Sequence, residues 1–164
     1  MRRAVRTTRA ITLLAVLGLA GCAPPNIDVA TAIKITDPVT GWYDAGVVGG
    51  MNKLVPSASF TVTNAGPDRV NSLQVFSVFR FTGESEELGS SMLVLHGADA
   101  LAPRGTSKPF TVRGTWGFTS LKPRAEMLVA KEMRDAHVEV FAKYGASPFI
   151  KVADLPVRRQ LLTQ

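Results

Sequence analysis

The feature that most constrains the fold is a two-residue repeat of apolar side chains in several short segments of the chain. The clearest example is Ser57–Thr63, in which Ala58, Phe60 and Val62 share one face and serines and threonines occupy the other. A helix would repeat every 3.6 residues, so a period of two indicates a half-buried strand. The pattern therefore predicts an all-β protein.

Residues 70–81 show the same period with apolar side chains on both faces. Leu73 and Val75 lie on one face, and Phe76 and Val78 lie on the other. A strand that is apolar on both faces is typical of the middle of a sheet. We therefore expect this strand to be a central one.

Gly- and Pro-containing turns separate the predicted strands. These strands cover residues 27–35, 57–63, 70–81, 89–95, 110–112, 136–144 and 149–157, and a short eighth strand over 42–48 is left open within an irregular, Gly-rich stretch, 39–54. Residues 123–133 are strong helix formers that begin with proline, so they predict one short helix before the penultimate strand. Seven or eight short strands predict a single immunoglobulin-like antiparallel β-sandwich domain over residues 28–164.

The N-terminal segment has the parts of an export signal. An Arg-rich opening is followed by an apolar run of 11 residues, Ala10–Ala20. A transmembrane helix needs about 20 apolar residues, so this run is too short to span a bilayer and is typical of a secretory leader.

The leader ends in Leu19-Ala20-Gly21-Cys22, and Cys22 is the only cysteine in the chain. This ending resembles the lipobox of bacterial lipoproteins, which are processed by the type II signal peptidase. The resemblance implies cleavage after residue 21, thioether and acyl (palmitate-type) lipidation of Cys22, and a short tether over residues 22–27. Two or more acyl chains give a stable membrane anchor, whereas one chain gives a marginal anchor.

The residue after the cysteine is Ala23 and not aspartate. By the same resemblance, the protein is expected on the outer membrane facing the periplasm, or on the outer face of the plasma membrane where the host has only one membrane. Without the four arginines of the leader, 15 basic residues face 13 acidic ones. This near balance and the export signal argue against a nucleic-acid partner.

Residues 58–113 carry a second resemblance, to the FxLYD type of bacterial envelope domain. The matching segments are Phe60–Gly66, Leu73–Arg80 and Leu101–Gly105, and the Leu-Tyr-Asp element of that family reads Val78-Phe79-Arg80 here. The resemblance implies an immunoglobulin-like sandwich on a lipoprotein and carries over no catalytic residue.

The sequence offers no constellation for catalysis or for a metal. His96 and His137 stand 41 residues apart without a ligand partner at a zinc spacing, and no G-x-S-x-G nucleophile motif occurs. With Cys22 lipidated, no thiol remains for catalysis. We therefore expect no cofactor, no metal site and no catalytic residue.

Four aromatic residues lie in Gly-flanked segments: Trp42, Tyr43, Trp116 and Phe118. Such rings either plug the ends of the sandwich or form a binding surface. The sequence therefore favours a non-catalytic, membrane-anchored lipoprotein that binds another envelope or membrane protein as an accessory subunit, through end loops or an unpaired edge strand. The alternative is a small-ligand or glycan-binding module that uses these four rings.

Overall fold

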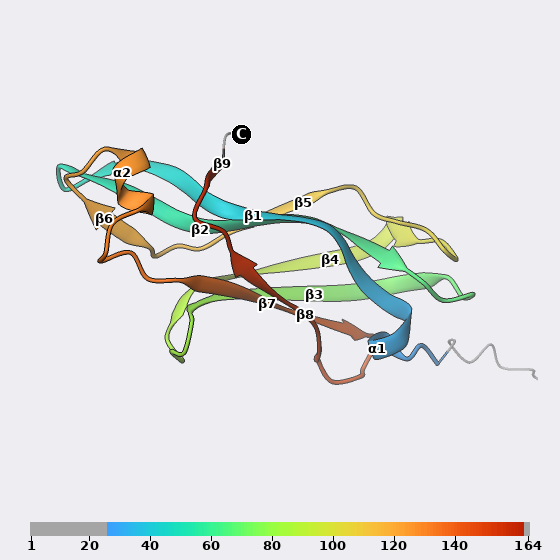
Figure 1. Cartoon of the computed structure of the whole chain (residues 1–164). Coiled ribbons are helices and arrows are strands. Elements are labelled where there is room, and N and C mark those ends of the chain that lie inside the picture. Colours follow the sequence, from blue (N-terminus) through green and yellow to red (C-terminus); the bar gives the residue numbers. More distant parts are fainter. Residues whose placement is uncertain (1–25, 163–164) are drawn as a thin grey trace, which may run out of the picture.

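The computed structural model describes residues 26–162, which form two β-sheets packed face to face with two short helices at the ends (Figure 1). The first sheet has the order β5 (Phe110–Arg113), β2 (Met51–Asn64), β1 (Ile33–Val48) and β9 (Leu161–Leu162), and β6 (Phe118–Ser120) also pairs with β2. The second sheet has the order β4 (Glu87–Leu101), β3 (Val70–Phe81), β7 (Ala136–Tyr144) and β8 (Ile150–Val157). The helices are α1 (Val29–Ala32) and α2 (Arg124–Leu128). The predicted β-sandwich is confirmed.

The strand order is that of an immunoglobulin-like sandwich. β1, β2 and β5 occupy the positions of strands A, B and E in one sheet, while β3, β7 and β8 occupy those of C, F and G in the other. β4 lies beside β3 instead of joining the first sheet. The pairing is antiparallel except between β1 and β9, which run parallel, so the prediction of a purely antiparallel sandwich needs this one correction.

The core lies between the sheets and is built by the alternation seen in the sequence. Ala58, Phe60 and Val62 of β2 are all buried, and Trp42 and Phe79 are the largest side chains that meet them from β1 and β3. β3 pairs with β4 on one side and β7 on the other, which confirms its predicted central place.

The prediction of a strand beginning at residue 27 is wrong. Residues 29–32 form α1, because the Asp28 side chain accepts a hydrogen bond from the Ala30 amide at 3.1 Å and caps the helix. β1 then begins at Ile33 and continues through Pro38 to Val48, well beyond residue 35, where the predicted strand ends. A register break between Thr36 and Val39 accommodates the proline, which has no N–H to donate to the ladder.

Residues 39–54 are likewise not irregular, because β1 and β2 form a long hairpin through them. The turn is Gly49-Gly50, and both residues have positive φ values, 58° and 79°. Two consecutive positive φ values define the tight turn that best matches the twist of a hairpin, and glycine adopts them without strain. The strand left open over 42–48 is therefore the second half of β1.

The predicted helix is present but shorter than expected. α2 covers residues 124–128, with Pro123 at its N-terminal boundary, and the rest of the predicted 123–133 segment is turns and loop. It precedes β7 as expected. The two-residue strand β9 follows β8, so β7 is penultimate only among the long strands.

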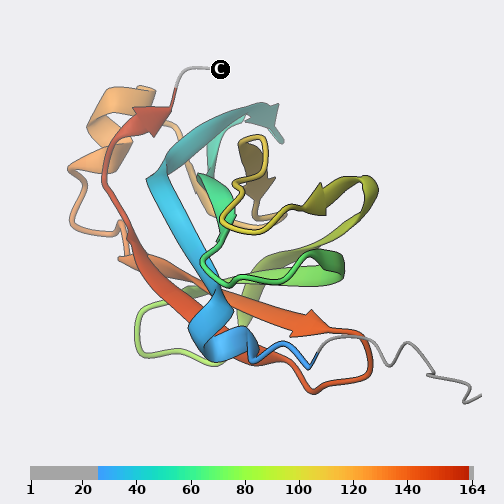
Figure 2. The ribbon, with the colours of Figure 1, turned by 90° about the vertical axis from the view of Figure 1, so that its right-hand side faces the viewer.

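One side of the sandwich is closed and the other is open. On the closed side the chain passes from β8 directly to β9 and so changes sheets, which Figure 2 shows as the orange-to-red ribbon joining the two layers. The Thr40 hydroxyl donates to the Pro156 carbonyl at 2.7 Å, and the Trp42 amide donates to the Gln160 carbonyl at 2.8 Å. On the open side, β4 and β5 are the edge strands.

The leader and the lipobox, Leu19, Ala20, Gly21 and Cys22, lie outside the described residues. Between residues 26 and 162, no helix is both long and apolar enough to cross a membrane.

Candidate interaction surface

The β1–β2 hairpin ends in a group of exposed apolar side chains. Val47, Val48 and Met51 surround its turn, and Leu121 and Trp116 lie on the segment that flanks β6. The exposed fractions are 51% for Val48, 82% for Leu121 and 65% for Trp116. We call these five residues the tip patch. Figure 1 shows the hairpin, β6 and α2 together at the end opposite α1.

Pairing of β6 with β2 holds the two parts of the patch together. Asn52 faces Ser120 in the ladder, and the Asn52 side-chain amide donates to the Lys122 carbonyl at 2.9 Å. Gly117 permits this approach, because a Cβ there would lie 2.0 Å from the Leu54 carbonyl oxygen. Leu121 and Trp116 are therefore fixed beside the hairpin by backbone contacts.

Cationic side chains cover two aromatic rings near the patch. The Lys53 ammonium lies 5.4 Å from the centre of the Trp116 ring and donates to the Thr115 carbonyl at 2.9 Å. The Arg113 guanidinium lies 3.7 Å from the centre of the Tyr43 ring. Cation–π contacts of this kind fix both partners and place positive charge at the rim of the patch.

α2 is held to the same end by an ion pair between Arg124 and Asp44. The hydrogen bond from Arg124, followed by one from the Gly46 amide at 2.9 Å, lowers the pKa of Asp44 below its ordinary value. Asp44 therefore stays ionised at neutral pH. Arg124 is neutralised by this ion pair, so the positive charge at the rim of the patch comes from Lys53 and Arg113.

The structure separates the four aromatic residues that the sequence grouped. Trp42 is wholly buried in the core, and its Nε1 has no hydrogen-bond partner among the described residues. Phe118 packs against the core, and Tyr43 is half-buried beneath Arg113. Trp116 alone of the four is largely exposed. The set therefore does not form one exposed aromatic platform.

The sequence reasoning missed Val47, Val48 and Met51, because they lie in the stretch expected to be irregular. The signal was present: two glycines between apolar residues are typical of a tight hairpin turn. Exposure of these valines is a tertiary property, because it depends on the other sheet not covering the tip.

Two carboxylates of the acidic segment after β3 are paired with arginines. Glu84 pairs with Arg134 at 2.6 Å, and Glu87 pairs with Arg80 at 3.0 Å. The described part of the chain contains no group of three or more His, Cys, Asp or Glu residues placed to hold a metal ion. The acidic turn after β3 thus carries ion pairs.

The two histidines lie apart. His96 is exposed on β4, whereas His137 on β7 bonds through Nδ1 to the Asp154 carboxylate at 2.8 Å. Burial acts to raise the pKa of Asp154, but His137 and Lys151 outweigh it and lower that pKa. His137 therefore belongs to a network of paired charges on the outer face of the second sheet.

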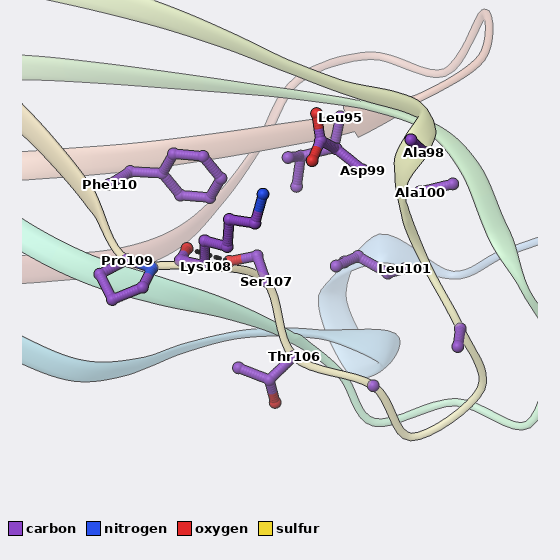
Figure 3. A pocket seen from close by; sticks show the side chains of 12 residues that line it. Leu95, Ala98, Asp99, Ala100, Leu101, Thr106, Ser107, Lys108, Pro109 and Phe110 are labelled. Atoms are coloured by element: carbon purple, nitrogen blue, oxygen red, sulfur yellow. Dashed lines mark hydrogen bonds between the residues drawn. The ribbon is translucent and has the colours of Figure 1, made fainter.

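A groove of about 460 Å³ opens between β4 and the segment leading to β5. Leu95, Leu101 and Phe110 form its apolar part, and Figure 3 shows Lys108 reaching into it between Phe110 and Asp99. The groove lies at the α1 end, away from the tip patch. With one cation and one carboxylate, it shows no net preference for a charged ligand.

No known protein family model matches the chain, and no curated protein sequence matches it. Among solved structures, the X-ray structure of the Northeast Structural Genomics Consortium target SoR45 is 9% identical, with a TM-score of 0.44 over 80% of this chain and 89% of that one. The solution structure of AT1g01470 from Arabidopsis thaliana is 11% identical, with a TM-score of 0.43 over 82% of this chain and 85% of that one. These likenesses concern the β-sandwich fold alone.

Proposed function

We propose that this protein is an exported lipoprotein, anchored to an envelope membrane through Cys22, that acts as a non-catalytic binding subunit. Its tip patch contacts another envelope protein, as an accessory subunit does within a membrane complex. The observation that carries the proposal is the exposed apolar tip patch at the end of the sandwich opposite the tether.

The lengths of the tether and the sandwich support this arrangement. A tether over residues 22–27 reaches at most about 20 Å when extended, because each residue adds about 3.4 Å. It joins the domain at α1, and the 16-residue strand β1 leads from there to the tip. A strand rises about 3.3 Å per residue, so the tip patch stands roughly 50 Å further from the anchored end.

The composition of the patch indicates a protein partner. Clustered exposed apolar side chains on a water-soluble domain mark interaction surfaces, and tryptophan is enriched among the residues that contribute most to binding. Lys53 and Arg113 add positive charge at the rim. The expected partner surface is therefore apolar at its centre and acidic at its edge.

Two experiments test the proposal. Replacing Cys22→Ser removes the acylated sulfur, so the protein is expected to move from the membrane fraction to the soluble fraction of the envelope. An unchanged membrane fraction would contradict the anchor.

For the contact surface, a photoreactive residue is placed at Val48, with Val39 as the matched control because both side chains are 51% exposed. Val39 lies in the first half of β1, away from the tip. Irradiation of living cells is expected to give a discrete protein adduct from position 48 and none from position 39. Adducts with lipid or glycan only, or the same adducts from both positions, would refute the role of the tip patch.

A further inference from the structure

β4 is the outer strand of the second sheet, and no described strand pairs with its other edge. Its regular ladder with β3 runs from Gly89 to His96, and register irregularities break it on both sides. The free edge begins after Leu88, whose carbonyl accepts bonds from the Thr115 and Trp116 amides at 2.8 and 2.7 Å. A free edge of this kind presents unpaired N–H and C=O groups to another strand.

The free segment lacks the proline and the charged side chains that commonly protect an edge strand, although β5 of the first sheet lies near β4. Residues 90–96 read Ser-Ser-Met-Leu-Val-Leu-His and contain no proline, lysine, arginine or carboxylate. The opposite edge of the same sheet differs, because β8 carries Lys151, Asp154 and Pro156 and lies against β1. Proline and charged side chains on an edge strand prevent pairing with other chains. Of the two edges of this sheet, β4 is therefore the one that can pair with a strand of another chain.

We propose that β4 pairs antiparallel with β4 of a second copy of this chain, about a two-fold axis through Leu93. This register places Met92 opposite Val94 of the second copy, Ser90 opposite His96, and Leu93 opposite itself. Met92 and Val94 thus meet apolar partners and the polar pair Ser90–His96 meets at both ends, whereas Ser91 stands opposite Leu95. The segment 90–96 is nearly palindromic in polarity, which an isologous interface requires.

Charge does not oppose this pairing. The nearest carboxylates on β4, Glu87 and Asp99, lie beyond the ladder irregularities on either side. Glu87 is already bound by Arg80 at 3.0 Å. Like charges directly opposite each other destabilise a ladder, and residues 90–96 contribute none.

The outer face of the second sheet continues across the proposed axis. Met92 lies beside Phe76 of β3, and Phe76 lies beside Phe141 of β7. Met92 and Val94 are both about half exposed as they stand. Pairing extends the row from Phe141 through Phe76 and Met92 to Val94 of the second copy, so exposed apolar surface becomes the centre of one eight-stranded sheet.

Disulfide trapping tests the register, because Cys22→Ser leaves the full chain without a thiol. In that background, Met92→Cys and Val94→Cys variants with different tags are mixed and oxidised. Residues opposite each other in an antiparallel pair have Cβ atoms about 4.5–5.5 Å apart, close enough for a disulfide once the strands adjust. We expect the mixed 92–94 disulfide to form at least ten times faster than disulfides of the Val39→Cys control.

A second measurement does not depend on cysteine. Light scattering of the Cys22→Ser protein is expected to give twice the chain mass, and Val94→Lys is expected to give a single-chain mass with an unchanged circular dichroism spectrum. Should Val94→Lys unfold, Met92→Lys replaces it. A single-chain mass for the unsubstituted protein at tens of micromolar, or trapping no faster than at position 39, would overturn the proposal and leave the role of the tip patch standing.

Discussion

Replacing Gly117→Ala is expected to detach β6 from β2. The new Cβ would stand 2.0 Å from the Leu54 carbonyl oxygen and 2.9 Å from the Val55 Cα. Both are backbone atoms, so the two segments must separate by about 1 Å to reach the closest contacts that real Cβ atoms show. The β6–β2 ladder has three residue pairs. Each lost hydrogen bond costs about 0.5–1.5 kcal/mol, so we expect a loss of about 2–4 kcal/mol in the free energy of unfolding.

Urea denaturation followed by circular dichroism measures this loss, and the melting temperature should fall by roughly 5–15 °C. Gly66→Ala is the control, because the nearest atoms to its Cβ are the Asn64 Oδ1 at 3.2 Å and the Ala32 Cβ at 3.4 Å. The Asn64 side chain is buried and hydrogen-bonded to Asp68 and Ala102, but it needs to shift by only a few tenths of an ångström, so we expect a clearly smaller loss of unfolding free energy than for Gly117→Ala. A Gly117→Ala protein as stable as this control would refute the reasoning.

Three further outcomes are expected. Asp44→Asn should destabilise the protein by less than about 1 kcal/mol at pH 7. The fold lowers the pKa of Asp44, so the stabilisation by its carboxylate is lost as the pH falls below the ordinary value of 3.8. Urea titrations of the native protein and the variant should therefore give converging unfolding free energies at low pH. Trp42→Phe should leave only the long-wavelength, readily quenched emission of Trp116, whereas Trp116→Phe should leave a shielded, short-wavelength emission. Thr40→Val should cost about 1–3 kcal/mol in thermal unfolding, since it leaves the Pro156 carbonyl without its donor and the Arg158 amide without its acceptor.

The sequence predicted the sandwich best where the alternation was complete. β3 and β7 were predicted at the bounds observed, because apolar residues occupy every second position of β7 and most of the inward positions of β3, and turn residues end both. Prediction failed where a local side chain or a turn decided the outcome. The Asp28 cap turned part of an apolar repeat into α1, and Gly49-Gly50 extended two strands through a stretch that composition alone marks as irregular.

The interaction surfaces were predictable only in outline. An unpaired edge or an end loop was expected as the contact surface, but the sequence does not say which edge stays free. That depends on β8 passing to β9 and covering one side, a long-range contact that no local pattern of residues encodes. Trp42 and Trp116 illustrate the same limit, because both stand in Gly-flanked segments and only the packed fold buries one and exposes the other.

The bond between Thr40 and Pro156 has a consequence for stoichiometry. By holding β8 against β1, it covers the β8 edge of the second sheet within the molecule. In the proposed dimer, each copy contributes the β4 edge of its second sheet, and one antiparallel contact uses both of these edges. A dimer of this kind leaves no free edge on the second sheet of either copy, so pairing through that sheet would stop at two chains and would not propagate into a filament.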